Sequence, residues 1–537
     1  MLLHAIIFLS GAAILALELL ASRVMTPYFG VSLYIWTGIL TITLVSLALG
    51  YWAGGKIASR AGGARPGARL TQLFALMPAV AAIGIVAACL AYPFVYAPLA
   101  NWSLVGGAFV ASLLLLFVPL VAASAMNPLL VAILIGSGKR GAAADAGAGH
   151  VFFVSTIGSV AGVFVTAFVL IPYVTNFSTL LIVALALAAL SLTAAIFVTA
   201  HLPGRTTVSV AGAIAAAMAA LLLWNADAYT GRQGPFAHGG AQWRLEATYG
   251  SIFGTVKVLR SEKTPASGER FLRMYFQDGL TQNTVDSENR SMSFYTYALE
   301  ALARAYQPQM HGALVLGLGA GMVPMRLAEL GVPVEVVDID PVAARVAQRF
   351  FGYSPQKAAT HRADARTFVR GCAGSYDVAI VDLFHGDGTP DHLVTREFFR
   401  DLRRCLADNG IAVFNTFADV TRPAGYAHFL ATLKSELPHL ALYRPNWPGS
   451  VHINSFVVAS ARPLPQPVRV TFDYVPAQHE RTLWDMLSAP TPLTSELYAG
   501  GQIITDARNP AARELAQTQV TYRKSVVETM PAAMLLN

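Results

Sequence analysis

The chain has 537 residues, of which 55% are hydrophobic and only 13% are charged, and its mean hydropathy of +0.51 is high for a soluble enzyme. The formal net charge of +7 comes without a basic patch of interleaved aromatic residues, so we expect no nucleic-acid partner. Charged residues are sparse up to about residue 225 and reach an ordinary density after it, which predicts a membrane part followed by a soluble part.

Seven apolar stretches in the first part are long enough to cross a bilayer, which takes roughly 20 residues each. They lie near 4–22, 33–54, 71–98, 103–124, 150–172, 177–200 and 206–224. The run that begins at residue 103 continues to residue 138 and is broken by Pro119 and by the segment 124–128, so an eighth span is an alternative. We therefore expect residues 1–225 to form a helical domain in the lipid bilayer.

The soluble part is expected to begin after a linker at 226–241. Residues 242–285 contain short runs of β-branched and aromatic residues broken by glycines, which predicts a small β domain. Over residues 286–537, buried apolar strands alternate with amphipathic helices, a pattern typical of a doubly wound, Rossmann-type α/β domain. Ligands of such domains bind beyond the carboxyl ends of the strands.

A glycine-rich turn follows the first strand of this α/β domain, in the segment LVLGLGAG. Gly317, Gly319 and Gly321 have the spacing G-x-G-x-G, whereas a dinucleotide fingerprint requires its third glycine where Met322 stands. The spacing favours a nucleoside or an amino-acid moiety over a dinucleotide with its pyrophosphate. A tight strand-to-helix connection without a ligand is the structural alternative.

Acidic residues end the next three strands. Asp338 follows the glycines by about 20 residues, a position where a carboxylate can accept hydrogen bonds from both ribose hydroxyls. Asp340 is explained equally well as a helix N-cap. Asp364, with Ala365 beside it, ends the third strand and can reach an adenine, and Asp382 ends the fourth. We therefore predict a methyltransferase-like site for an S-adenosyl-type sulfonium nucleoside.

The soluble part resembles spermidine synthases, the polyamine aminopropyltransferases, in the segments YFQDGLTQ, LVLGLGAG, VVDIDP, RADAR and YDVAIVDLFHGDGTPDHLVTREFF. The segments ALGYWAGGKIASR and IITDARNP resemble the bacterial branch in which a multi-span helical region precedes the synthase. The resemblance implies transfer of propylamine from decarboxylated S-adenosylmethionine, a co-substrate and not a bound cofactor, to an amine such as putrescine, with release of methylthioadenosine. It implies no metal, and it makes a homo-oligomer a further expectation.

The resemblance also implies roles for individual residues. Asp382 matches the catalytic aspartate, which would take a proton from the acceptor ammonium, whose pKa of about 10 keeps it protonated at neutral pH. Gln282 and Tyr295 match positions that contact substrate from the lid side. His385 stands at the position of a second catalytic-loop carboxylate, and Asp387 follows it closely. Helix packing by Tyr295 and loop capping by His385 are the structural alternatives.

Three positions depart from the family pattern. Ala320 replaces an aspartate that holds the ammonium of the aminopropyl arm, His385 replaces a carboxylate, and Gly250 replaces a glutamine. Loss of the loop carboxylate removes a repulsion of about 1–4 kcal/mol against a donor that keeps its carboxyl group. A transferase or lyase that uses undecarboxylated S-adenosylmethionine is therefore one alternative function. A transporter or sensor that binds a nucleoside without catalysis is another.

Basic loop residues indicate the orientation of the membrane domain. The second loop carries Lys56, Arg60, Arg65 and Arg69, the fourth carries Lys139 and Arg140, and the third and fifth carry neither Lys nor Arg. The positive-inside rule places the two basic loops and the N-terminus in the cytoplasm, so seven spans leave the soluble part outside. The S-adenosyl chemistry favours the inside, and we expect a multi-pass protein of the bacterial inner membrane with a cytoplasmic catalytic domain.

The chain contains three cysteines, Cys89, Cys372 and Cys405. Cys89 lies within an expected span, and the three together argue against a disulfide framework. Their spacing does not match a zinc site.

Overall fold

The computed structural model describes residues 1–31, 33–61, 66–136, 144–263, 271–383, 388–419, 423–447 and 452–536. The chain forms two compact units. The helical unit contains Met1–Phe236, Tyr249–Thr255 and Val526–Asn537, and the α/β unit contains Ala237–Thr248 and Val256–Ser525. Residues 249–255 and 526–537 thus belong to the helical unit, although the residues next to them in sequence belong to the α/β unit.

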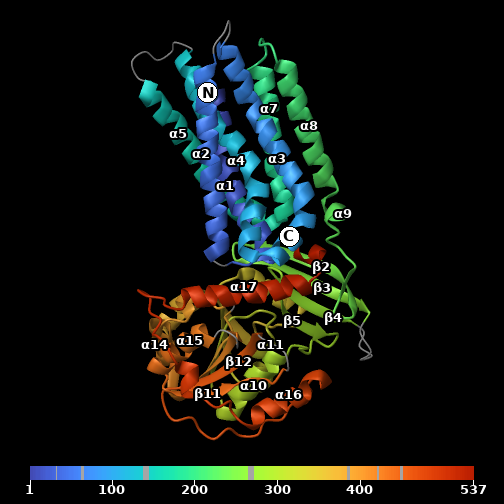
Figure 1. Cartoon of the computed structure of the whole chain (residues 1–537). Helices are drawn as coiled ribbons and strands as arrows, with labels where there is room; N and C mark the ends of the chain where they lie inside the picture. The colour runs from blue at the N-terminus through green and yellow to red at the C-terminus, as the bar shows by residue number, and fades with distance from the viewer. Residues whose placement is uncertain are drawn as a thin grey trace. The chain divides into compact units, whose positions relative to one another are not determined.

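Long apolar helices make up the helical unit, and they run side by side in Figure 1. Seven helices of the described part of the chain are long and apolar enough to cross a membrane. They are α1 (Leu2–Phe29), α2 (Leu33–Arg60), α3 (Pro66–Trp102), α4 (Leu104–Gly136), α5 (Ala144–Val165), α7 (Asn176–Phe197) and α8 (Arg205–Trp224). α5 continues through η1 (Thr166–Leu170) into α6 (Ile171–Tyr173), and α9 (Ala226–Thr230) follows α8.

Small residues allow these helices to approach closely. Gly50 and Gly54 of α2 lie against α4, and the neighbouring atoms leave no room for a Cβ at either position. Gly11 of α1 lies in the same way against the backbone carbonyl of Ser155 in α5. Contacts between small residues are typical of helices that pack in lipid, where burying apolar surface does not by itself favour association.

The α4 helix continues without a break from Leu104 to Gly136 and contains both Pro119 and Pro128. The structure therefore has one helix where the sequence also allowed two short crossings. Successive helices of this set alternate in direction, so the N-terminus and α9 lie at opposite ends of the helical unit (Figure 1).

The first of the two sheets has five strands in the order β1-β2-β3-β4-β5. They are β1 (Phe236–His238), β2 (Ala241–Ser251), β3 (Gly254–Lys263), β4 (Leu272–Gln277) and β5 (Leu280–Asp286). Asp278 and Gly279 form the tight turn between the antiparallel strands β4 and β5, and both have positive φ, 47° and 89°. The Asp-Gly pair is favoured in such hairpin turns for this conformational reason.

The tip of the β2–β3 hairpin belongs to the helical unit. A Cβ at Gly250 would overlap the backbone carbonyl of Ile171. Arg23 of α1 donates a hydrogen bond to the carbonyl of Ile252 in the same tip. Gly250 therefore stands at a close backbone contact, which explains physically why no larger residue occupies this position.

The second sheet has seven strands in the order β11-β12-β10-β9-β6-β7-β8. Its strands are β6 (Ala313–Leu316), β7 (Val334–Asp338), β8 (Ala358–Arg362), β9 (Tyr376–Val381), β10 (Leu406–Asp419), β11 (His439–Tyr443) and β12 (His452–Ser460). All neighbours pair in parallel except β12, which is antiparallel to β10 and to β11. This is the methyltransferase-type, Rossmann-like fold that the sequence predicts, and its strand order reverses between β6 and β9.

Two apolar cores lie on the two faces of this sheet. Ala313 and Val315 of β6 belong to one core, and Leu314 and Leu316 belong to the other. They alternate because successive side chains of a strand point to opposite faces of the sheet. The first core includes residues of α10 (Phe294–Tyr306), α11 (Met322–Glu329), α12 (Pro341–Phe350) and α16 (Ala477–Ser488). The second includes residues of α13 (Ala365–Gly371), α14 (Arg396–Cys405) and α15 (Pro423–Glu436).

Cys372 and Cys405 form a disulfide in this second core, with their Cα atoms 5.1 Å apart. The bond joins the residue after α13 to the last residue of α14. The expectation that three cysteines do not form a disulfide framework did not foresee this single bond. The two cysteines are 33 residues apart in sequence, and their pairing depends on the packing of α13 against α14, which cysteine spacing does not reveal.

Candidate active site

The glycine-rich turn connects β6 to α11 at the reversal point of the sheet. Gly317, Gly319 and Gly321 all have positive φ, at 96°, 51° and 79°, which L side chains rarely adopt. A Cβ at Gly317 would overlap the carbonyl of Asp382, and one at Gly321 would lie 2.7 Å from the ring of Tyr353. At Gly319 a Cβ would meet no atom within 4 Å. The outer two glycines thus permit close packing, while Gly319 borders open space that a ligand can occupy.

Asp338 ties this turn to the end of β7. Its Oδ2 accepts a 2.8 Å hydrogen bond from the backbone N–H of Leu318, and its Oδ1 accepts one of 2.8 Å from the N–H of Asp340. Burial raises the pKa of Asp338 to about 6, although these backbone hydrogen bonds oppose the shift. Each carboxylate oxygen has a second lone pair, so the predicted contact with a ribose stays compatible with this geometry.

Two of the acidic residues cap helices. Asp340 accepts a 2.9 Å hydrogen bond from the second residue of α12, which supports the N-cap interpretation of that residue. Asp364 accepts one of 2.8 Å from the third residue of α13, and its Oδ2 lies 3.8 Å from Nε2 of His392. Ala365 is the buried first residue of the same helix. The adenine contact predicted for Asp364 and Ala365 stays a prediction.

Asp382 follows β9 and lies beside the glycine turn. Its backbone N–H donates a 2.9 Å hydrogen bond to the carbonyl of Leu316. The side-chain amide of Asn415, on the adjacent strand β10, donates a 2.8 Å hydrogen bond to Oδ1 of Asp382. Burial raises the pKa of Asp382 to about 6, and the hydrogen bond from Asn415 limits the rise. A carboxylate with a raised pKa is a better proton acceptor than an ordinary aspartate.

Tyr295, the second residue of α10, lies within electrostatic range of Asp382. Burial is the main reason that the pKa of its phenol is raised, and the charge of Asp382 raises it further. Its hydroxyl oxygen accepts a 3.3 Å hydrogen bond from the amide of Asn283 on β5. Tyr275 on β4 has a pKa raised by burial and by several charges, Asp338 among them, so it borders the same region.

Gln282 lies at an irregularity of β5. Tyr275 pairs with Asn283 and Phe276 with Thr281, so Gln282 has no partner in the register of β4 and β5. Bulges of this kind turn a side chain out of the ladder and occur next to active sites. His385 and Asp387, the other two residues predicted on the acceptor side, lie outside the described residues.

The structure brings the glycine turn, Asp338, Asp382 and Tyr295 together at the carboxyl edge of the sheet. The sequence interpretation missed Asn415, although a polar residue inside the apolar segment IAVFNTF is a usable signal. It also missed α17 (Ala512–Thr529), whose fully buried Arg523 donates a 2.8 Å hydrogen bond to the carbonyl of Asp278. The next residue toward the N-terminus, Tyr522, packs on Phe417 with ring centroids 4.4 Å apart.

Comparisons with known proteins bear on the α/β unit. Residues 292–427 match the family model "Spermine/spermidine synthase domain". A polyamine aminopropyltransferase of Vibrio vulnificus is 32% identical over 178 residues, which cover 32% of this chain and 56% of that protein. An N-terminal histidine N-methyltransferase of Emericella nidulans is 34% identical over 137 residues, which cover 25% of this chain and 24% of that protein.

The chain therefore spans little more than half of the Vibrio relative and about a quarter of the Emericella one. Among solved structures, a probable spermidine synthase from Corynebacterium glutamicum is similar, with 19% identity and a TM-score of 0.36, over 50% of this chain and 93% of that one. Residues 292–427, in the α/β unit, are thus similar to the spermine/spermidine synthase domain and to polyamine aminopropyltransferases.

Proposed function

We propose that the protein is a membrane-anchored polyamine aminopropyltransferase, which transfers propylamine from decarboxylated S-adenosylmethionine to an amine such as putrescine. The observation that supports this best is the position of Asp382. It lies beside a glycine turn at the reversal point of the sheet, it is held by Asn415, and its pKa is raised to about 6. A proton acceptor placed next to a nucleoside cradle is what this transfer requires.

In the proposed reaction, the acceptor ammonium gives a proton to Asp382 and its nitrogen attacks the carbon next to the sulfonium. The new C–N bond forms as the C–S bond breaks, and the electron pair stays on sulfur, which leaves as neutral methylthioadenosine. The glycine turn would cradle the nucleoside, with Asp338 on its ribose and Asp364 and Ala365 near its adenine. Tyr295 and Gln282 would orient the amine.

Undecarboxylated S-adenosylmethionine is the second candidate donor, and Ala320 is the observation that favours it. This residue is buried in the glycine turn and provides no carboxylate for an aminopropyl ammonium. A donor that keeps its own carboxylate therefore meets no like charge from this position.

Incubation of the purified full-length protein with each donor, with and without putrescine, tests the proposal by mass spectrometry. We expect methylthioadenosine and spermidine only from the decarboxylated donor together with the diamine. Methylthioadenosine from the ordinary donor selects the second candidate. Nucleoside binding without turnover with either donor contradicts both and supports a nucleoside-binding transporter or sensor.

We also propose the bacterial inner membrane as the location of the helical unit. Its seven helices of membrane-spanning length support a membrane protein. A cytoplasmic α/β unit stays the prediction from substrate chemistry, while the positive-inside rule with seven crossings predicts the other side. A reporter enzyme fused after Asn537 and active on only one side of the membrane distinguishes the two predictions.

A further inference from the structure

A cavity of about 490 Å³ lies in the helical unit, where α2 ends and α3 begins. Three cationic side chains line it, and none of its described lining residues is acidic. The lining consists of Trp52, Ala53, Lys56, Ile57, Arg60, Ala61, Arg69, Leu70 and Leu73. The cavity is thus basic on one part of its wall and apolar on the rest.

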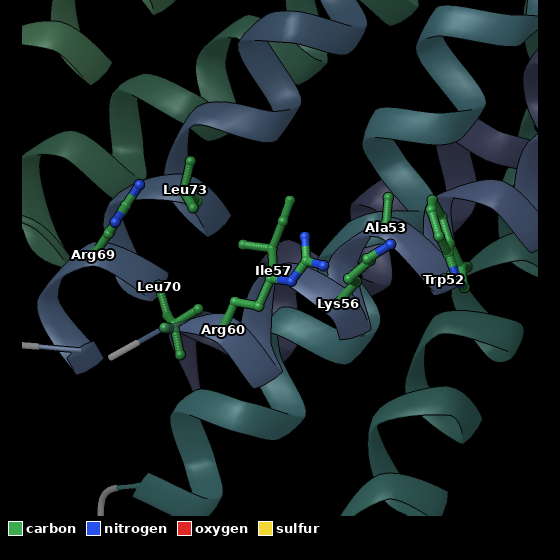
Figure 2. A pocket seen from close by; sticks show the side chains of 9 residues that line it. Trp52, Ala53, Lys56, Ile57, Arg60, Arg69, Leu70 and Leu73 are labelled. Atoms are coloured by element: carbon green, nitrogen blue, oxygen red, sulfur yellow. The ribbon is translucent and has the colours of Figure 1, made fainter. Parts of the chain in front are cut away.

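The helical period of α2 builds the basic wall. Trp52, Lys56 and Arg60 follow one another at intervals of four residues, which places them along one face of the helix. Figure 2 shows Lys56 and Arg60 on α2 and Arg69 on the facing helix. Nζ of Lys56 lies 4.4 Å from the centroid of the Trp52 ring, a cation–π contact that holds the ammonium at the cavity.

The positive charges of the basic wall favour binding of an anion. Lys56, Arg60 and Arg69 are exposed, and none of the ion pairs seen between described residues involves them. Like charges gathered around one cavity repel one another, and the repulsion is relieved when an anion binds between them. Guanidinium groups match phosphate oxygens in geometry, and an ammonium contributes a point charge.

The apolar wall indicates which anion. Trp52 and Ile57 are exposed, with 61% and 42% of their surface accessible, on a helix of membrane-spanning length. Tryptophan is typical of the bilayer interface, where its ring contacts both headgroups and acyl chains. A basic pocket between membrane helices with such a rim fits an amphiphile that carries a phosphate.

We propose that this cavity binds the phosphate of an anionic phospholipid headgroup, whose acyl chains pass along Trp52 and Ile57. A soluble phosphate compound shares the headgroup's chemistry but lacks the chains. The site lies at the end of the helical unit that contains the N-terminus, because α2 returns to that end before α3 begins (Figure 1). The proposal does not depend on the activity of the α/β unit.

The test uses the full-length protein, freed of lipid in a neutral detergent, and measures its binding of three probes. These are dioleoylphosphatidylglycerol, dioleoylphosphatidylcholine and inorganic phosphate, with binding measured by native mass spectrometry and by the shift in Tm. We expect phosphatidylglycerol to bind and to raise Tm, and the other two probes to do neither. Equal effects of both lipids overturn the proposal. Equal effects of phosphatidylglycerol and inorganic phosphate keep the phosphate site and overturn the lipid as its source.

Matched variants separate the site from general surface charge. Arg60→Gln and Arg69→Gln should each weaken phosphatidylglycerol binding about fivefold, the factor that corresponds to about 1 kcal/mol per basic residue. Arg205→Gln removes the same charge from an exposed residue at the start of α8, at the same end of the helical unit, and should leave the affinity unchanged. An equal loss in Arg205→Gln overturns the proposal.

A second variant tests the cavity itself without a change of charge. Ala53→Trp places a large side chain in the space that a headgroup would fill. We expect it to abolish phosphatidylglycerol binding, while the Tm of the lipid-free protein and its elution in size-exclusion chromatography stay those of the wild type as evidence of folding. Full lipid affinity in this variant contradicts occupation of the cavity.

Discussion

The side-chain amide of Asn415 donates a 2.8 Å hydrogen bond to Oδ1 of Asp382 from the neighbouring strand of the same sheet. Asn454 in turn donates a 3.0 Å hydrogen bond to the amide oxygen of Asn415. This second bond fixes which end of the Asn415 amide faces the carboxylate. Asp382 is therefore held in one orientation while burial raises its pKa to about 6.

The pH dependence of activity should reflect the pKa of Asp382 and the effect of Asn415 on it. A general base acts in its deprotonated form, so kcat/KM of the wild-type protein should fall as the pH drops through about 6. Asn415 lowers the pKa of Asp382, so Asn415→Leu should move the acidic limb of the profile upward by about 1 pH unit. Rates of methylthioadenosine formation measure the shift. Asn454→Leu should give a smaller shift, and identical limbs in all three proteins contradict the role of Asn415.

Replacement of the base itself should separate catalysis from binding. We expect Asp382→Asn to lower kcat by about 10²–10⁴-fold, because the amide cannot accept the ammonium proton, while methylthioadenosine affinity is largely kept. Calorimetric titration measures the affinity. Asp377→Asn is the control, since Asp377 lies near the opposite end of β9 and accepts a hydrogen bond from the backbone of His311. Unchanged turnover in Asp382→Asn removes this residue from the mechanism.

Two glycines of the same turn should respond differently to alanine. Gly317→Ala adds a Cβ that overlaps the carbonyl of Asp382, so we expect a lower Tm and loss of activity together. Gly319→Ala adds a Cβ to open space at a φ of 51°, which costs about 1 kcal/mol. Its Tm should change less, and its methylthioadenosine affinity should fall because the new methyl group occupies space meant for the ligand. Wild-type affinity in Gly319→Ala contradicts this placement of the nucleoside.

The Tyr295 hydroxyl should matter for the acceptor amine. We expect Tyr295→Phe to raise KM for the amine by about tenfold, the loss of roughly one hydrogen bond to a charged group, with a smaller effect on KM for the donor. Steady-state kinetics with each substrate varied in turn measure the two constants. The hydroxyl of Tyr297 donates to the carbonyl of Ser291 within the protein, so Tyr297→Phe is the matched control. Equal changes in both constants contradict a specific contact with the amine.

Local sequence patterns predicted the order of strands and helices and the residues that stand at the strand ends. Alternating strands and helices predicted the parallel sheet, and strand ends placed Gly317, Asp338 and Asp382 at one edge of it. The bond from Asn415 to Asp382 depends on the register of β10 against β9, which no local pattern fixes. Gly250 is explained by a contact with Ile171, 79 residues earlier, and such long-range contacts are invisible in one sequence.

The bond between Cys372 and Cys405 makes the α/β unit a reporter of its own surroundings. Disulfides persist in oxidising compartments and are rare in the reducing cytoplasm. Cells can be lysed with a reagent that blocks free thiols. Whether Cys372 and Cys405 are then found oxidised or reduced records the side of the membrane on which the α/β unit folded. A reduced pair agrees with the cytoplasmic prediction. An oxidised pair places the unit on the periplasmic side, as the positive-inside rule predicts for seven crossings, and contradicts the cytoplasmic prediction.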